Sequence, residues 1–168
     1  MTHPTQMAAA RQGTLTPQMQ QVLSDERISA TDLLTRVADG RIAIPANRNH
    51  TSLRARGVGA GLTTKINVNL GVSEDCCNVE RELDKVRRAI ELKADAIMDL
   101  STFGDTRAFR RRAVDISPVM LGTVPIYDAV ARYGKDVAAI SVDDFFQVVR
   151  MHAEDGIDFM TIHAGLTR

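Results

Sequence analysis

The sequence predicts an α/β protein in which a mostly helical N-terminal extension, residues 1–62, precedes four successive βα units in residues 63–168. Two observations lead to this fold class. Four short apolar runs alternate with segments of helical periodicity, which is typical of a parallel sheet with helical crossovers. Each run also ends in a polar or sulfur-bearing side chain, and barrel enzymes of this class carry their sites at the C-terminal ends of the strands. The last run, 157–163, ends in His163.

The N-terminal extension contains three helical patterns and one short strand. In order, these are a helix at 7–12, a helix opened by Thr16 and Pro17, a helix at 29–37 and a strand at 41–46. Threonine is a common helix cap, and proline is favoured at the first helical position. Pro45 indicates an edge or the end of the strand, because proline cannot donate to the ladder. We expect this extension to pack against the main body.

A dense polar cluster, Asn47, Asn49 and His50, follows this strand. Such residues suit an ordinary surface loop as well as a functional site, and the sequence leaves both interpretations open. Three glycines, at positions 57, 59 and 61, then indicate a flexible stretch. Their spacing lacks the preceding strand and the third glycine position of a dinucleotide-binding loop, so we expect no nucleotide site there.

The four βα units begin with strand runs at 65–71, 94–101, 117–123 and 157–163. Ser73 is expected to cap the first helix, whose apolar stripe repeats at helical spacing in Val79, Leu83, Val86 and Ile90. Thr123 is expected to cap the helix after the third run, with Pro125 in its first turn. Ser141 is expected to cap a helix over 142–154 that Gly156 ends.

A short basic helix over about 105–113 carries Arg107, Arg110, Arg111 and Arg112. Such a row could bind phosphate or nucleic acid. No aromatic residues interleave for base stacking, so a solvated helix face is the favoured interpretation. His152 is likewise expected on a helix face, without a chemical role.

Composition narrows the class of protein further. Lysine plus arginine equals aspartate plus glutamate, at 21 each, which gives no general attraction to nucleic acid or to an anionic membrane. No run approaches the ~18 apolar residues of a membrane span, and the first six residues lack the basic and apolar regions of a secretory signal. We therefore expect a cytoplasmic protein. Cys76 and Cys77 are adjacent, which disfavours a disulfide or a zinc site and indicates unpaired thiols in a reducing compartment.

A doubly wound sheet is the structural alternative to a barrel-type arrangement. Such sheets commonly bind a phosphate at a glycine-rich turn after the first strand. None of the four strand runs is followed by a convincing turn of that kind, so the sequence favours the barrel-type arrangement.

Five segments, taken in order and spacing, resemble the phosphomethylpyrimidine synthase (ThiC) family. They are IPAN at 44–47, KINVNLG at 65–71, MDLS at 98–101, SPVMLGTVPIY at 117–127 and TIHAG at 161–165. The resemblance covers the chain from about residue 7. It implies a radical S-adenosylmethionine enzyme with a (β/α)8 barrel, of which this chain holds a truncated half barrel with the first four βα units. The family rearranges 5-aminoimidazole ribotide into 4-amino-5-hydroxymethyl-2-methylpyrimidine phosphate for thiamine biosynthesis.

A close relative, 5-hydroxybenzimidazole synthase, converts the same substrate into the lower-ligand base of a cobamide. Residues 98–104 resemble a branch shared by both enzymes, so the two products both stay open. Two further interpretations also stay open. The chain could be a non-catalytic remnant, or an interaction module whose open sheet edge pairs with another chain.

Carried over by motif, the imidazole-ribotide site would include Asn69, Met98, Tyr127 and His163. The side-chain chemistry agrees with this set. An amide both donates and accepts hydrogen bonds, a thioether packs on a flat ring, a phenol donates while its ring forms an apolar wall, and an imidazole moves protons near neutral pH. Each residue alone also suits a structural role, but four such residues on four consecutive βα units favour a site.

The resemblance also implies a 4Fe–4S cluster, S-adenosylmethionine and zinc. In the family, a three-cysteine motif near the C-terminus holds the cluster, and the zinc ligands lie in the second half. Neither region is present in this sequence, and Cys76 and Cys77 cannot replace three spaced thiolates. We therefore expect no metal ligands in this chain, a small-molecule substrate, no nucleic-acid or membrane partner, and either a homodimer or a missing C-terminal half covering the open sheet edge.

Overall fold

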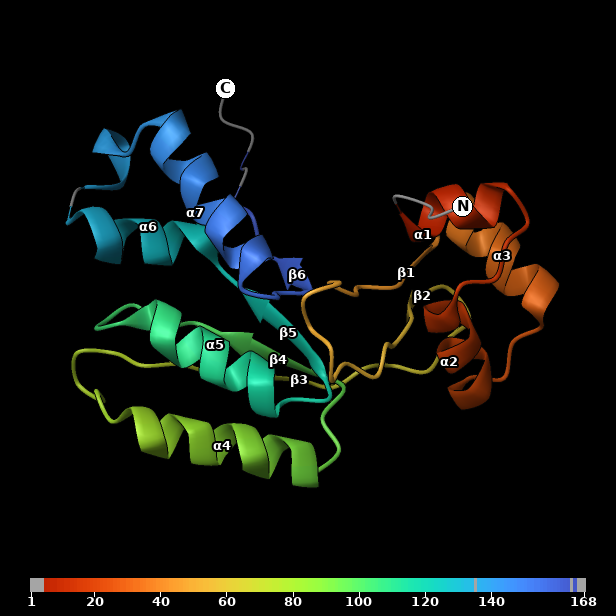
Figure 1. The fold of residues 1–168 in the computed structure, drawn as a ribbon, viewed down its shortest axis with the longest axis horizontal. Coiled ribbons are helices and arrows are strands. Elements are labelled where there is room, and N and C mark those ends of the chain that lie inside the picture. Colours follow the sequence, from red (N-terminus) through yellow and green to blue (C-terminus); the bar gives the residue numbers. More distant parts are fainter. Residues whose placement is uncertain (1–4, 135, 164, 166–168) are drawn as a thin grey trace.

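The computed structural model describes residues 5–134, 136–163 and 165 (Figure 1). Residues 1–4, part of the segment assessed for a secretory signal, and Ala164 of the C-terminal motif lie outside the described residues. The described helices are α1 (Gln6–Arg11), α2 (Pro17–Asp25), α3 (Ala30–Ala38), α4 (Val79–Glu91), α5 (Thr106–Ile116), α6 (Pro125–Tyr133), the 3₁₀ helix η1 (Val137–Ala139) and α7 (Val142–Glu154). The strands are β1 (Ile42–Ala43), β2 (Val58–Gly59), β3 (Asn67–Leu70), β4 (Ala96–Asp99), β5 (Met120–Thr123) and β6 (Phe159–Met160).

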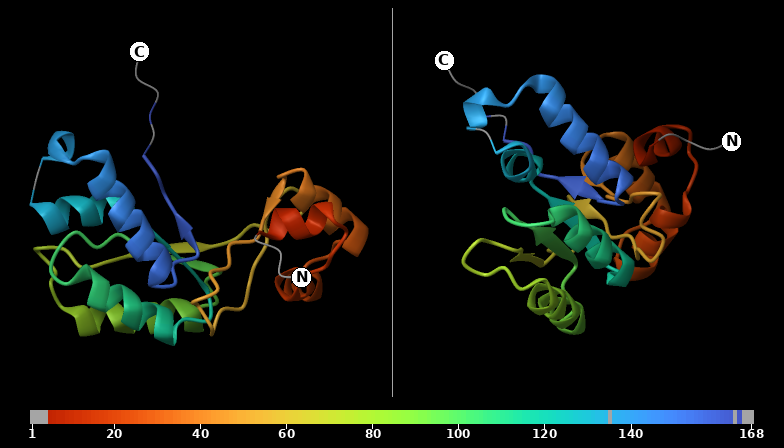
Figure 2. Two further views of the ribbon diagram at one scale, coloured as in Figure 1. Left: turned by 45° about the horizontal axis from the view of Figure 1, so that its top comes forward. Right: turned by 60° about the vertical axis from the view of Figure 1, so that its left-hand side comes forward.

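The N-terminal helices form a unit with its own apolar core. Thr16 accepts a hydrogen bond from the Met19 amide at 3.2 Å, and Pro17 opens α2, which confirms the predicted helix start. The core of this unit includes Met19, Leu33 and Val37, all of them buried. Figures 1 and 2 show the unit beside the sheet, joined to it by the segment that follows α3.

The glycine stretch is more ordered than the sequence indicated, because β2 pairs antiparallel with β1. Gly59 has a φ of +148°, and a Cβ there would overlap the Arg41 carbonyl oxygen. This close approach of two backbones requires a glycine at that position.

The main body is a parallel four-stranded sheet in the order β3-β4-β5-β6. Strand order therefore follows chain order, as it does in a barrel, whereas a doubly wound sheet reverses its order at a switch point. The α/β class is confirmed, and the arrangement is consistent with part of an α/β barrel.

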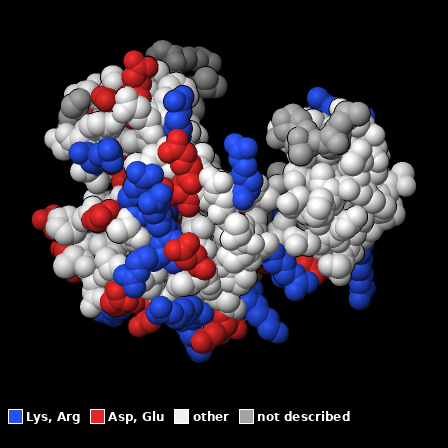
Figure 3. All heavy atoms as spheres, in the orientation of Figure 1, with Lys and Arg blue, Asp and Glu red and all other residues white. Residues whose placement is uncertain are grey.

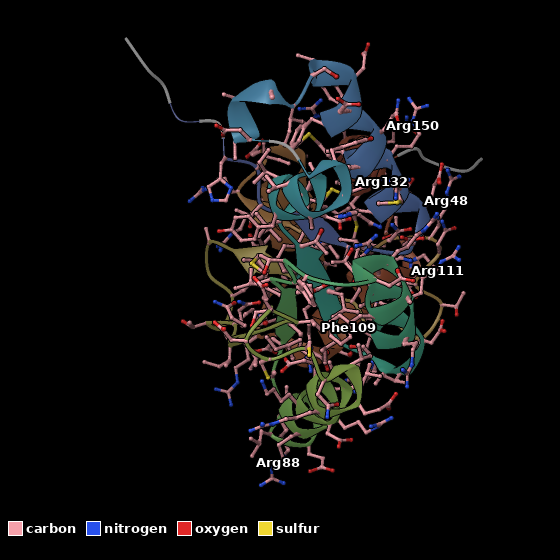
Figure 4. All side chains as sticks on the ribbon, turned by 90° about the vertical axis from the view of Figure 1, so that its left-hand side faces the viewer. Arg48, Arg88, Phe109, Arg111, Arg132 and Arg150 are labelled. Carbon is pink, nitrogen blue, oxygen red and sulfur yellow. The ribbon has the colours of Figure 1, made fainter. Side chains whose placement is uncertain are left out.

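One face of the sheet packs against α4 and α5. The predicted stripe of α4 points inward, and its Leu83 and Val86 are fully buried. They share a core with Ile97, Leu121 and Phe109. Figure 4 shows the labelled Phe109 in the interior of the molecule and the labelled Arg88 at its edge. Each such aliphatic or aromatic side chain contributes roughly 1.5–3 kcal/mol through burial. This core fixes the sheet on which the candidate site stands.

Two predicted helix caps are wrong. Ser73 forms a reciprocal backbone pair with Cys76, with N···O distances of 3.1 and 3.3 Å, so the chain turns before α4 begins. Asn78 caps α4 instead, accepting from the Arg81 amide at 3.0 Å. Thr123 does not cap α6, because its hydroxyl meets Nδ1 of His152 at 2.8 Å. The predicted cap of α7 is confirmed, because Ser141 forms a full capping box there.

The basic helix α5 is not simply a solvated face, as the sequence suggested. Arg107, Arg110 and Arg111 converge on the buried carboxylate of Asp155, with N···O distances of 2.9–3.2 Å. The Arg110 side chain is itself only 1% exposed. These arginines therefore bind a buried carboxylate that belongs to the end of α7, and Arg110 also contacts Asp128. The row thus has a structural role that its sequence did not indicate. Figure 3 likewise shows acidic and basic side chains interspersed over this part of the molecule.

His152 is also not a simple helix-face residue. It is buried between α6, α7 and the end of β5, where its Nε2 donates to the Asp128 carboxylate at 2.8 Å. Burial raises the pKa of Asp128, but hydrogen bonds from His152 and Thr106 and the charge of Arg110 together lower it to about 2. This network joins three helices to the sheet.

The polar cluster after β1, for which the sequence left open a surface loop or a functional site, has a structural role. Asn47 donates its backbone amide to Asp158 at 2.8 Å and its side-chain amide to the Ala153 and Ile157 carbonyls. His50 places Nδ1 at 2.7 Å from Asp158 and Nε2 at 2.7 Å from the Ser117 carbonyl oxygen. These contacts lie where β5 and β6 begin, which is the end of the sheet opposite the predicted site.

Candidate functional site

One row of side chains crosses the sheet near the C-terminal ends of its strands. Asn69 is paired with Met98, Met98 with Gly122, and Gly122 with Phe159. Successive side chains in a strand alternate between faces. Since Leu70, Ile97 and Leu121 belong to the helix-covered core, this row lies on the opposite face, which we call the site face.

Two of the predicted site residues, Asn69 and Met98, are therefore neighbours on the site face. Asn69 is exposed and Met98 is half-buried. Asn67, two residues earlier and on the same face, donates its side-chain amide to Oδ1 of Asn69 at 2.8 Å. This contact uses Oδ1 of Asn69 as an acceptor and does not engage its Nδ2 donors. The sequence analysis did not single out Asn67, although the period of two in β3 carries the signal for it.

The other two predicted residues meet at the edge of β6. The rings of Tyr127, in the first turn of α6, and His163 stack with centroids 5.8 Å apart and planes inclined by 30°. His163 also lines a pocket of about 250 Å³ beside the start of α7. Its other walls include Ile126, Ile140, Phe145, Thr161 and Ile162.

Thr161 connects the two pairs. Its hydroxyl donates toward Sδ of Met98 at 3.9 Å, and it also lines the pocket that contains His163. The structure thus brings the four predicted residues to one rim as two contacting pairs with Thr161 between them. Thr161 and Phe159 were not singled out from the sequence, although both share the alternation that places His163 at the end of this run.

Two acidic residues, Asp99 and Asp128, are buried behind this rim. Burial raises the pKa of Asp99, the last residue of β4, although Ser101 donates hydrogen bonds that oppose the shift. Asp128 directly follows Tyr127 in sequence, and its network with His152 fixes the first turn of α6. The rim residues can therefore bind and orient a small polar ring, while the ionised groups hold the elements that carry them.

Among the described residues, no group of three His, Cys, Asp or Glu side chains could hold a metal ion. Cys76 and Cys77 are free thiols in the loop after β3, and two adjacent thiols do not fit the spaced thiolates of an iron–sulfur cluster. Within the described part of the chain, no helix is both long and apolar enough to cross a membrane.

Comparison with known proteins places these features in one family. The family model described as "Radical SAM ThiC family" matches residues 5–168. A phosphomethylpyrimidine synthase of Pelotomaculum thermopropionicum is 57% identical over 168 residues, which is all of this chain and 39% of the relative. The enzymes of that name from Clostridium tetani and Fusobacterium nucleatum are each 55% identical, covering 100% and 99% of this chain and 37% and 38% of their own lengths. The chain thus spans less than two-fifths of these curated relatives, and it belongs to the radical SAM ThiC family.

Proposed function

We propose that this chain is the N-terminal, substrate-binding half barrel of a phosphomethylpyrimidine synthase, in which residues 1–62 form the extension and residues 63–168 the partial barrel. The observation that carries the proposal is the match at 55–57% identity across the chain to enzymes of that name. The sequential parallel strand order supports a half barrel. Two separate apolar cores support the division into an extension and a sheet-bearing part.

The proposed ligand is 5-aminoimidazole ribotide, bound at the rim by Asn69, Met98, Tyr127 and His163. Asn69 would donate an amide hydrogen to an acceptor on the ligand, since Asn67 occupies its oxygen. Met98 would pack against the imidazole ring. Tyr127 and His163 would act together, because their stacked rings fix each other's orientation at the rim.

The chemistry of the radical step would be supplied from outside this chain. A 4Fe–4S cluster bound with S-adenosylmethionine generates the radical in such enzymes, and we propose that the cluster and zinc ligands belong to a further segment or partner. That segment, or a second copy in a homodimer, would cover the free edge of β6. The cytoplasm, with its reducing conditions, is the compartment we propose for the free thiols Cys76 and Cys77.

The test is product analysis on the full-length protein that carries this sequence, reconstituted anaerobically with iron, sulfide and S-adenosylmethionine. The proposal expects 5-aminoimidazole ribotide to be converted into the pyrimidine phosphate. Formation of 5-hydroxybenzimidazole would assign the chain to the cobamide branch instead, and no ribotide binding at all would favour a remnant or an interaction module.

A second arm uses the 168-residue chain alone, under the same reconstitution. It is expected not to release 5′-deoxyadenosine from S-adenosylmethionine, because its two adjacent thiols cannot hold the cluster. Turnover by this chain alone would contradict the assignment of the cluster to another segment.

A further inference from the structure

Gly122 of β5 has a spatial role that its backbone conformation does not explain. Its φ lies outside the left-handed region, so other residues could adopt the same backbone geometry. A Cβ at this position would nevertheless overlap Cε2 and Cζ of Phe159 and approach Cδ2 to 2.8 Å. The ring of Phe159 therefore lies over Gly122 on the site face and occupies the space that any larger residue would fill.

The position of this ring matters because of its neighbours. Gly122 is the register partner of Met98, and Met98 is the partner of Asn69. Neighbouring strands lie about 4.8 Å apart, so a ring leaning over β5 reaches toward the β4 side chain. Thr161, two residues after Phe159, contacts Sδ of Met98 at 3.9 Å. The ring is thus placed within the candidate site rather than behind it.

Phe159 also differs from the core aromatic residue of the same sheet. Phe109 is 1% exposed and belongs to the core under α4 and α5. Phe159 is only partly buried. Among the described residues it belongs neither to the cores of the extension and the sheet nor to a smaller apolar cluster of Ala129, Val148 and Met151 on α6 and α7. It therefore packs against β5 on the site face and not in the core under the helices.

We propose that Phe159, seated over Gly122, is the stacking surface for the heterocycle of the ligand, with Met98 beside it. This inference rests on the proposed function, because the heterocycle is the imidazole of the ribotide. Aromatic side chains stack on planar nitrogen heterocycles without needing specific hydrogen bonds. Phe159 would then set how deeply the ring lies, while Asn69 and His163 set its orientation.

The test compares two ligands on the full-length protein and four variants. Phe159→Leu keeps an apolar side chain but removes the planar surface, and it is expected to weaken 5-aminoimidazole ribotide binding on the order of tenfold. Binding of ribose 5-phosphate, which lacks the heterocycle, should change little. Phe146→Leu, at an exposed phenylalanine on α7, is the matched control and should affect neither ligand.

Gly122→Ala tests whether Gly122 and the Phe159 ring depend on each other. It is expected to displace the Phe159 ring and weaken ribotide binding, whereas in a Phe159→Leu background the same change should cost much less. Thermal unfolding of each variant checks that the fold is retained, and Phe159→Leu alone still decides the question if Gly122→Ala does not fold.

The outcomes separate the two proposals. Absence of ribotide binding by the unaltered protein would overturn the proposed function, and the stacking role would fall with it. Normal ribotide binding by the unaltered protein together with equal binding by Phe159→Leu would overturn the stacking role alone. Equal losses for the ribotide and ribose 5-phosphate would also overturn it, since they would indicate a general disturbance of the rim.

Discussion

The His50 side chain is expected to be a buried imidazolium, and its charge should make the stability of the fold depend on pH. Both of its ring nitrogens face acceptors, namely the Asp158 carboxylate and the Ser117 carbonyl oxygen, each at 2.7 Å. Two acceptors require two N–H donors, which only the protonated ring provides. Burial lowers the pKa of His50, but the hydrogen bond and charge of Asp158 and the bond to Ser117 raise it above 6.5 overall.

The direction of the pH effect follows from linkage. The folded state binds the second ring proton of His50 more tightly than the unfolded chain does. The stabilisation of the fold by this proton is therefore complete below the unfolded pKa of 6.5. The stabilisation is lost as the pH rises through the higher pKa of the folded state. Each pKa unit gained on folding corresponds to about 1.4 kcal/mol.

The perturbation is His50→Gln, measured by urea unfolding between pH 6 and pH 9. Both side chains of the pair are fully buried, and removing one partner of a buried pair typically costs about 3–5 kcal/mol. We expect a loss of this order at pH 6 that becomes smaller toward pH 9. Arg88→Gln is the control, since the exposed Arg88–Glu91 pair should contribute at most about 0.5 kcal/mol.

Two results would refute this reasoning. One is a difference between the unaltered chain and His50→Gln that does not vary with pH above 6.5. The other is a nitrogen NMR spectrum at pH 6, below the unfolded pKa, in which one ring nitrogen of His50 carries no proton.

Three further outcomes are expected. The pKa of Asp128 is about 2 in the folded state against 3.8, so its carboxylate should stabilise the fold fully above pH 3.8 and lose this effect as the pH falls toward 2. Acid unfolding followed by circular dichroism should therefore show a stability of Asp128→Asn that depends less on pH in this range. An unchanged pH dependence in that variant would contradict the network. Leu83→Ala should cost about 2–5 kcal/mol in urea unfolding because Leu83 is fully buried under the sheet, and a cost below 1 kcal/mol would argue against that core. His163→Ala should leave thermal unfolding unchanged while weakening ribotide binding by ~1–3 kcal/mol, and unaltered calorimetric affinity would remove His163 from the site.

Local signals in the sequence were enough for the order of the main helices and of the four parallel strands, although they did not indicate β2 or η1. The Thr16-Pro17 start of α2, the stripe of α4 and the Ser141 cap of α7 all depend on residues within a few positions of one another. The parallel class also followed, because alternating strand and helix patterns leave few topologies. Ser73 shows where such signals fail: serine is a good cap, but a backbone pairing with Cys76 turned the chain before the helix could begin.

The site was predictable only as a set of residues. Motif resemblance supplied Asn69, Met98, Tyr127 and His163, and strand alternation put the first two on one face. That Tyr127 stacks on His163, and that Thr161 stands between the pairs, depends on how α6 and the end of β6 are placed across the sheet. No local pattern encodes a contact between residues 36 positions apart, the separation of Tyr127 and His163.

The sequence by itself determined the family and the order of the main helices and of the parallel strands, because these depend on composition, spacing and short-range capping. It also supplied the residues proposed to bind a ligand. Only the tertiary structure decided which polar residues have a structural role. Asn47, His50, Arg110 and His152 all looked like surface or site residues, yet each is satisfied by a partner at least 18 positions away. Burial makes an unpaired polar group costly, so its role is set by the distant group that pairs with it, and that pairing exists only once the chain has folded.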